Sequence, residues 1–245
     1  MLNPCAWDHL ADHWAPAIEY LREKVQQKLG ESLHSYWLRG SLARGTAVDG
    51  ISDIDTFAIV HSDESLRWEE AVFKSQLQSQ MQTQFPFAGD LELYCSAYHT
   101  NFAQHYPQLA MIIKTQSLCL IGEDIRPNLP SFRPGRAMML NWRWVEEDLN
   151  DFLKKSEPKE EDVRAICKIL IRVSFELVME RENKYTNDLY ICCQAFERYY
   201  PEQATLIWEL LSCFLNPKEN KTRTRTLISE IGSFLVHEVN CYFLA

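Results

Sequence analysis

The sequence predicts an α+β fold: a small domain with a mixed β-sheet at residues 1–130, followed by an all-α helical bundle at residues 131–245. Three observations support this prediction. The 245 residues are 46% hydrophobic and 24% charged, so the chain can bury a sizeable core. Short β-type runs lie in the first half of the chain. After Gly135 only one glycine, Gly232, interrupts a helical pattern that continues to the end.

The elements of the first domain follow from periodicity and from turn residues. Apolar residues recur at three- and four-residue spacing from Ile18 to Leu29, which predicts an amphipathic helix that ends at Gly30. Apolar runs predict four strands, and a Gln-rich segment before Pro86 predicts a helix. The predicted strands are residues 35–39, 54–60, 91–97 and 117–121, and the predicted Gln-rich helix is 65–84. This order of elements is typical of a small mixed sheet.

The second domain is expected to follow a linker, because three of the ten prolines lie between residues 127 and 134. Its apolar periodicity predicts helices at residues 136–154, 160–182, 186–200, 202–215 and 222–243. Thr186 or Asn187 is expected to cap the third of these helices.

Charge and hydropathy exclude several classes of protein. The net charge is −9, which disfavours a nucleic-acid partner and an anionic membrane surface. The sequence has no run of about 20 apolar residues. Asp8 and His9 lie where a signal peptide would have its apolar core, so we expect a cytoplasmic protein without a membrane partner. The negative charge is uneven, because residues 1–130 carry 16 Asp/Glu against 9 Lys/Arg (−7) and residues 131–245 carry 18 against 16 (−2), so a divalent metal ion could use carboxylates of the first domain.

The most informative segment joins a glycine-serine turn to two aspartates. Gly40 lacks a Cβ atom, so the backbone at Gly40 and Ser41 can approach an anion such as a phosphate. Asp53 and Asp55 are two residues apart at the start of a buried β-run, so both carboxylates are expected on one face. Mg²⁺ is the natural cation between them. The alternative, an ordinary turn with strand-edge aspartates, leaves two acidic groups at the end of a buried strand without a partner.

This segment closely resembles the signature of the DNA polymerase β-type nucleotidyltransferase superfamily. The resemblance is carried by Gly40-Ser41-x-Ala43-Arg44-Gly45, followed by Ser52-Asp53-Ile54-Asp55. It implies that Gly40 and Ser41 bind the phosphates of a nucleoside triphosphate, and that Asp53 and Asp55 bind Mg²⁺. It also implies that Arg44 neutralises charge on the β- and γ-phosphates.

The resemblance also implies a third carboxylate on a later strand, which must come from residues 89–94. Alternation does not choose between Asp90 and Glu92, because both side chains point the same way. Position favours Glu92, which lies inside the strand, whereas Asp90 follows a glycine at its start. The Leu-Glu-Leu context resembles the aminoglycoside adenylyltransferases, which implies that Glu92 is both a metal ligand and the general base.

The helical half resembles, more weakly, the C-terminal domain of the antibiotic adenylyltransferases. The resemblance lies in a helix, a Lys-containing turn and a helix that begins at an aspartate, around residues 166–189. It implies that Lys184 contacts the nucleotide. Acidic residues such as Glu180 and Asp188 would then lie near the acceptor and favour a cationic one.

The implied function is Mg²⁺-dependent transfer of a nucleoside monophosphate, AMP from ATP, to a hydroxyl of a small acceptor such as an aminoglycoside-like molecule, with release of pyrophosphate. Two alternatives stay open. One is an antitoxin-type enzyme that transfers AMP to a partner toxin protein, and the other is a catalytically silent nucleotide-binding regulatory module. The presence of Asp53, Asp55 and a third acidic residue disfavours the silent module.

Overall fold

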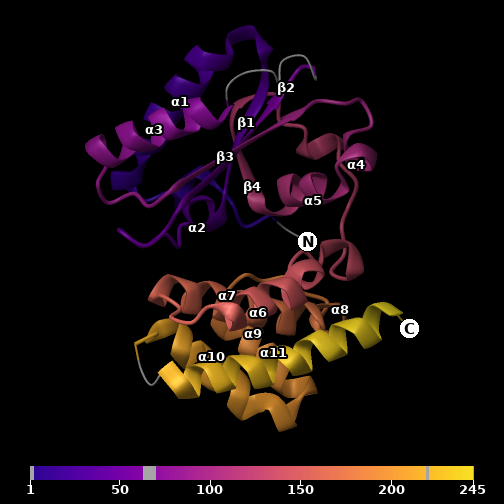
Figure 1. Cartoon of the computed structure of the whole chain (residues 1–245). Helices are drawn as coiled ribbons and strands as arrows, with labels where there is room; N and C mark the ends of the chain where they lie inside the picture. Colours follow the sequence, from indigo (N-terminus) through magenta and orange to yellow (C-terminus); the bar gives the residue numbers. More distant parts are fainter. Residues whose placement is uncertain (1–2, 63–69, 219–220, 245) are drawn as a thin grey trace. The chain divides into compact units, whose positions relative to one another are not determined.

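The computed structural model describes residues 3–62, 70–218 and 221–244 (Figure 1). The chain divides into two compact units, residues 1–132 and 133–245, and each is described by itself below. The first residues of the predicted Gln-rich helix, 65–69, lie outside the described residues.

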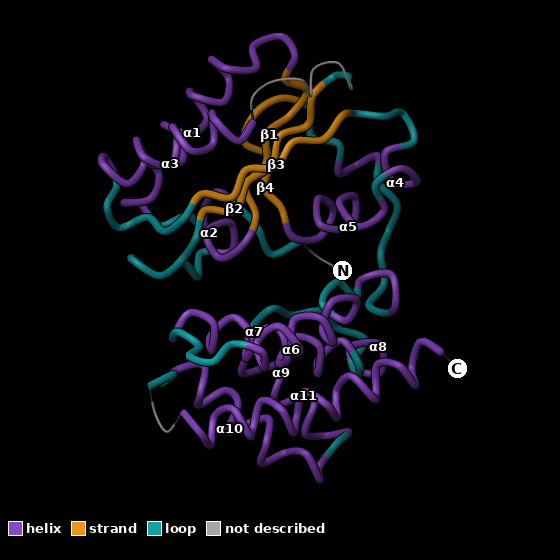
Figure 2. Tube along the Cα trace, viewed as in Figure 1, coloured by secondary structure: helices purple, strands orange, loops and turns teal. Residues whose placement is uncertain are grey.

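The first unit is built on a four-stranded mixed sheet with strand order β3-β2-β1-β4 (Figure 2). β1 pairs antiparallel with β2 and β4, whereas β2 and β3 are parallel. The strands are β1 Leu33–Arg39, β2 Ile54–Val60, β3 Leu91–Ala97 and β4 Ser117–Gly122. The predicted fold class, a small mixed sheet followed by helices, is confirmed.

Alternate residues of the strands contribute to two hydrophobic clusters, one on each face of the sheet. On the first face, Leu38, Ile54 and Leu91 pack with apolar residues of α1 and α3. On the second face, Trp37 and Phe57 pack with α4 and α5. The helices are α1 Ala15–Leu29, α3 Glu70–Gln84, α4 Phe102–His105 and α5 Pro107–Gln116. Both faces of the sheet are therefore covered, as Figure 1 shows for the helices around β1 to β4.

Two features of the first unit differ from the sequence prediction. The sequence prediction does not include α4 and α5. Both helices are short and Pro107 lies between them, so neither shows a long helical period. The predicted turn at Gly40 is the beginning of a short helix, α2 Gly40–Arg44, which ends at Gly45.

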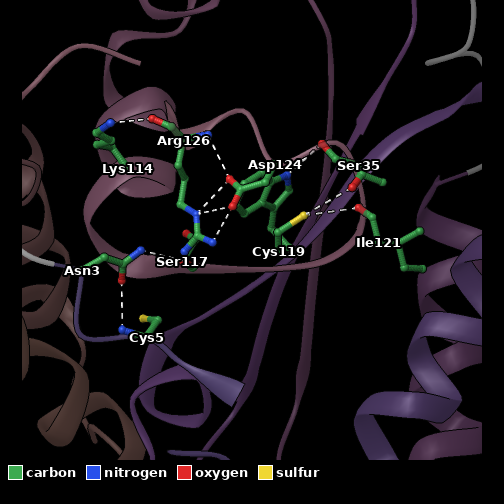
Figure 3. A network of polar contacts seen from close by, with 11 residues as sticks. Asn3, Cys5, Ser35, Lys114, Ser117, Cys119, Ile121, Asp124 and Arg126 are labelled. Carbon is green, nitrogen blue, oxygen red and sulfur yellow. Dashed lines mark hydrogen bonds and ion pairs between the residues drawn. The ribbon is translucent and has the colours of Figure 1, made fainter. Parts of the chain in front are cut away.

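A polar network fixes the start of β4 (Figure 3). The Ser117 carbonyl accepts hydrogen bonds from Asn3 Nδ2 at 2.8 Å and from Arg126 Nη1 at 3.2 Å. Arg126 also pairs with Asp124, and its hydrogen bonds hold the pKa of the Asp124 carboxyl below its ordinary value. Ser117 is the register partner of Arg39. The network therefore stabilises the start of β4, where this strand pairs with Arg39, the last residue of β1.

The second unit is a helical bundle in which α7 contacts the other five helices: α6, α8, α9, α10 and α11. Its helices are α6 Val145–Lys154, α7 Glu160–Glu176, α8 Met179–Glu182, α9 Leu189–Tyr199, α10 Ala204–Leu215 and α11 Lys221–Leu244. α7 is buried on more than one side, with Cys167, Leu170 and Ile171 all inaccessible to solvent. Among the described residues, no helix is long and apolar enough to cross a membrane.

The first predicted helix of this unit, 136–154, is wrong in its first half, where the chain forms only short 3-10 turns before Val145. The reason is Glu176, a buried residue at the end of α7. Its carboxylate accepts the backbone N–H groups of Leu140 at 2.7 Å, Asn141 at 2.9 Å and Trp142 at 3.0 Å. A side chain distant in sequence thus binds donors that would otherwise serve a helix.

The predicted cap of α9 is also wrong. The N-cap is Asp188, whose carboxylate accepts the backbone N–H of Ile191 at 3.1 Å. Thr186 Oγ1 instead accepts the N–H of Asp188 at 3.1 Å, in the loop before the helix. Asp188 is preferred because its carboxylate also interacts favourably with the helix dipole.

We expect Glu176→Gln to lower the free energy of unfolding of the chain by about 1–3 kcal/mol, the usual cost of leaving buried donors unsatisfied. The amide that replaces one carboxylate oxygen is a donor and faces other N–H donors. Urea unfolding, followed by circular dichroism, measures the effect. Glu161→Gln, at an exposed position of the same helix, is the control. Equal stability of the two variants would contradict this role of Glu176.

Candidate functional site

Two acidic side chains lie side by side on adjacent parallel strands. In the pairing of β2 with β3, Asp55 is the register partner of Glu92. Their neighbours Ile54, Leu91 and Leu93 are buried against the first face of the sheet, so Asp55 and Glu92 point to the second face. Both are partly exposed, at the end of the sheet where β2 and β3 begin.

Arg39, the last residue of β1, joins these two carboxylates. Its Nη2 atom is 3.3 Å from Asp55 Oδ1 and 3.2 Å from Glu92 Oε2. The three side chains come from three neighbouring strands, β1, β2 and β3, and are between 27% and 38% exposed. The two acidic groups therefore converge on one cation.

Gly40 follows Arg39 and has a φ of +77°, a conformation that L side chains rarely adopt. A Cβ atom at this position would lie 2.1 Å from Asp55 Oδ2. Glycine is therefore required for two reasons, the backbone conformation and the close approach of the Asp55 carboxylate. Ser41, the next residue, lies in the first turn of α2, where backbone N–H groups have no acceptor within the helix.

Asp53 lies one residue before β2 and is exposed. Its Oδ1 atom accepts the backbone N–H of Asp90 at 3.2 Å. This contact joins the two segments that lead into β2 and β3. Gly89 is also close, because a Cβ atom there would lie 2.6 Å from the Ser52 carbonyl oxygen. The structure therefore brings Asp55 together with Glu92 and places Asp53 at the strand entrance.

The two candidates for the third carboxylate have different surroundings. Asp90 precedes β3, and its Oδ1 atom accepts a hydrogen bond from Gln78 Nε2 at 3.4 Å. Glu92 lies within β3 and shares the Arg39 contact with Asp55. Glu92 also adds to the effect of burial in raising the pKa of Tyr94. The geometry thus favours Glu92 as the partner of Asp55.

The donor set suits a divalent cation of the Mg²⁺ type. Asp55 and Glu92 offer carboxylate oxygens, which hard cations prefer, and the two groups already face a common positive charge. Within the described ranges, no group of three or more His, Cys, Asp or Glu side chains is arranged to hold a metal ion. Mg²⁺ commonly binds only one or two carboxylates and completes its coordination shell with water and substrate phosphates. Asp55 and Glu92 therefore fit Mg²⁺.

The loop from residue 45 to 53, which connects the glycine-serine turn with the aspartates, is held by Asp49. Its Oδ1 atom accepts hydrogen bonds from His13 Nε2 at 2.9 Å and from Trp14 Nε1 at 3.1 Å. The Gly50 N–H donates to the Phe87 carbonyl at 2.7 Å. These contacts fix the separation between α2 and the start of β2.

The sequence prediction missed Arg39 and Asp49. A signal for Arg39 was present in the sequence, because a basic residue is the last residue of a buried strand and directly precedes the Gly-Ser turn. Strand alternation puts it on the same face as Trp37. Asp49 had no such signal, since its partners lie 35 and 36 residues away in the sequence.

The remaining predicted residues lie elsewhere. Arg44 ends α2 and is partly buried, and its charge opposes the effect of burial on the pKa of Cys5. Lys184 belongs to the second unit, where it is exposed in the turn after α8. Its backbone N–H donates to the Met179 carbonyl at 3.4 Å. The predicted roles of both residues stay predictions.

Comparison with known proteins identifies a domain in this part of the chain. Residues 18–96 match the family model described as a nucleotidyltransferase domain, a range that includes β1, α2, β2 and most of β3. The chain therefore carries a nucleotidyltransferase domain, and the protein is a transferase of the nucleotidyl-transferring class, similar to the DNA polymerase β type. The resemblance found in the sequence is confirmed.

A solved structure has a similar fold. It is the crystal structure of spectinomycin adenyltransferase AAD(9) from Enterococcus faecialis with ATP and spectinomycin. The sequences are 15% identical, the TM-score is 0.51, and the match covers 90% of this chain and 98% of that one. No sequence among curated proteins matches this chain.

We expect Gly40→Ala to impair nucleotide binding, because its Cβ atom would displace the Asp55 carboxylate. Gly50→Ala is a matched control. Gly50 has a similar φ of +71°, but a Cβ atom there meets nothing within 4 Å. The left-handed backbone conformation alone should cost each variant about 1–2 kcal/mol of stability. Only Gly40→Ala should lose ATP affinity in the presence of Mg²⁺, measured by calorimetry. Equal ATP affinity in the two variants would show that the close approach is unimportant for binding.

Proposed function

We propose that this protein transfers AMP from ATP to a hydroxyl group of a small acceptor and releases pyrophosphate, with Mg²⁺ as the cofactor. The observation that carries the proposal is the pair of carboxylates on β2 and β3, Asp55 and Glu92, beside the glycine-serine turn at Gly40. The nucleotidyltransferase domain supplies the reaction class. The nucleotide, the metal and the acceptor are the proposed parts.

Asp53, Asp55 and Glu92 would hold Mg²⁺. When bound, Mg²⁺ supplies positive charge that stabilises the attacking and departing oxygens of phosphoryl transfer. Asp55 and Glu92 are already neighbours, whereas Asp53 lies at the strand entrance and keeps the segment before β3 in place through Asp90.

The glycine-serine turn would bind the triphosphate. Backbone N–H groups at the start of α2 have no acceptor within the helix, so they can donate to phosphate oxygens. Arg44, at the end of the same short helix, would offset the charge of the β- and γ-phosphates. The phosphates would then lie beside Asp55, because the Gly40 backbone is in contact with that carboxylate.

In the reaction, the acceptor hydroxyl oxygen attacks the α-phosphorus of ATP. A new oxygen-phosphorus bond forms, the bond from the α-phosphorus to the bridging oxygen breaks, and pyrophosphate leaves with that electron pair. Glu92 accepts the hydroxyl proton as the general base. Its partly exposed position leaves its carboxylate accessible to an acceptor.

A small acceptor is supported by the similar solved structure, which was determined with ATP and spectinomycin. That likeness favours a small molecule over the toxin protein of the alternative hypothesis. An acidic wall for a cationic acceptor has weaker support. Glu180 accepts a hydrogen bond from the Tyr242 hydroxyl at 2.7 Å, and Asp188 caps α9. Both carboxylates thus already serve contacts within the second unit.

We expect Asp55→Asn to abolish transfer, because it removes a charge needed for the cation. Glu92→Gln should keep ATP binding and slow the chemical step by about a hundredfold, the usual contribution of a general base. Asp90→Asn is the matched control, since it alters a carboxylate two residues away at the strand entrance. Pyrophosphate release measures all three. An inactive Asp90→Asn together with an active Glu92→Gln would reverse the assignment.

The reaction itself is tested with labelled ATP, Mg²⁺ and a panel of aminoglycosides, aminocyclitols and hydroxylated metabolites. We expect acceptor-dependent pyrophosphate release and a labelled acceptor. Removal of Mg²⁺ with a chelator should stop the release. Transfer of label to a protein, with none to any small acceptor, would instead favour the antitoxin-type function. ATP binding without transfer to either would favour the regulatory module.

Two further predictions stay open. Lys184→Ala should weaken ATP binding if this lysine contacts the nucleotide, and unchanged ATP affinity by calorimetry would remove it from the site. The cytoplasmic location expected from the sequence also stays a prediction.

A further inference from the structure

A single nitrogen atom of Arg39 lies between the two carboxylates of the site. Nη2 is 3.2 Å from Glu92 Oε2 and 3.3 Å from Asp55 Oδ1. An arginine that serves as a fixed partner usually binds a carboxylate through two parallel hydrogen bonds of about 2.7–2.9 Å. Arg39 makes longer contacts and divides one nitrogen between two residues. The ion pairs of Arg39 are therefore weak, and its guanidinium occupies the position between Asp55 and Glu92 that would attract a metal cation.

The strands at this end of the sheet are already held together by backbone pairing, so the Arg39 side chain is not needed for that purpose. β1 is joined to β2 by an antiparallel ladder that includes Leu38 and Thr56, and β2 is joined to β3 along its whole length. The Thr56 hydroxyl also donates to the Glu92 carbonyl at 2.8 Å. The sheet therefore holds together at this end without the Arg39 side chain.

Charge explains why an arginine is there. Asp55 and Glu92 are register partners, so two negative charges are held close together. Like charges at such positions destabilise a sheet. The Arg39 guanidinium reduces that repulsion, and a divalent cation would do the same with twice the charge. One positive group at this point opposes the entry of another.

We propose that Arg39 is a positioning residue that competes with the divalent cation for Asp55 and Glu92. In the metal-free protein its guanidinium keeps the two carboxylates together, and it must leave them when a metal ion binds. Arg39 therefore lowers the affinity of the site for a free divalent cation. This inference rests on the proposed function, because it concerns the cation that the proposed reaction uses.

The test measures Mn²⁺ binding to the whole chain in the absence of nucleotide, by electron paramagnetic resonance of the free ion. We expect Arg39→Met, which keeps the apolar stem, to bind Mn²⁺ at least about ten times more tightly than the wild type at low salt. Arg39→Lys keeps the charge and should stay close to the wild type. Arg22→Met is the control, because it removes an arginine that pairs with Glu19 on α1.

A second measurement covers the metal-free state. The melting temperature of Arg39→Met without metal should fall below that of the wild type, and saturating Mn²⁺ should raise it more in the variant. Arg39→Gln provides the same comparison if Arg39→Met does not fold. The added Asp55→Asn change should remove the gain in Mn²⁺ affinity, because it removes one of the two ligands.

Equal or weaker Mn²⁺ binding by Arg39→Met overturns the inference, and so does the absence of binding in both proteins. These results are separate from the fate of the proposed function, which depends on pyrophosphate release. A wild type that transfers AMP, with no tighter Mn²⁺ binding in Arg39→Met, defeats only the inference. Tighter binding in Arg39→Met without transfer to any acceptor defeats only the proposed function.

Discussion

The parallel register between β2 and β3 is the constraint on which the site depends. It places Asp55 opposite Glu92, and a shift of one residue would turn Glu92 to the other face of the sheet. Apolar residues enforce this register, because Ile54, Leu91 and Leu93 must all face the cluster that packs with α1 and α3. The position of two acidic groups is thus determined by the burial of their apolar neighbours.

Close backbone approach is the second requirement at this end of the sheet. Gly40 lets the start of α2 lie against the Asp55 carboxylate, and Gly89 lets the entrance of β3 lie against Ser52. Both positions would place a Cβ atom within 3 Å of an oxygen. Arg39 then balances part of the negative charge that the strands bring together. The site therefore combines glycines for proximity with an arginine for charge.

The second unit is organised in a similar way, by one buried acidic residue. Glu176 lies in the middle of the bundle sequence and binds three backbone N–H groups of the preceding segment. Burial raises the pKa of its carboxyl, and the hydrogen bonds from residues 140–142 oppose that rise. A segment without α-helical structure is held against α7 by this residue, so α6 begins only at Val145.

The sequence by itself determined the fold class, the four strands and the nucleotidyltransferase signature. These are local: alternation defines a strand, and the glycine-serine turn and the aspartates lie within about 20 residues of each other. The tertiary structure decided what depends on residues distant in sequence. It paired Glu92 rather than Asp90 with Asp55, and it brought Arg39 to Asp55, 16 residues away, and to Glu92, 53 residues away. The physical reason is that strand pairing joins residues distant in the sequence, so the order of the strands and the partner of each residue are decided only in the folded sheet.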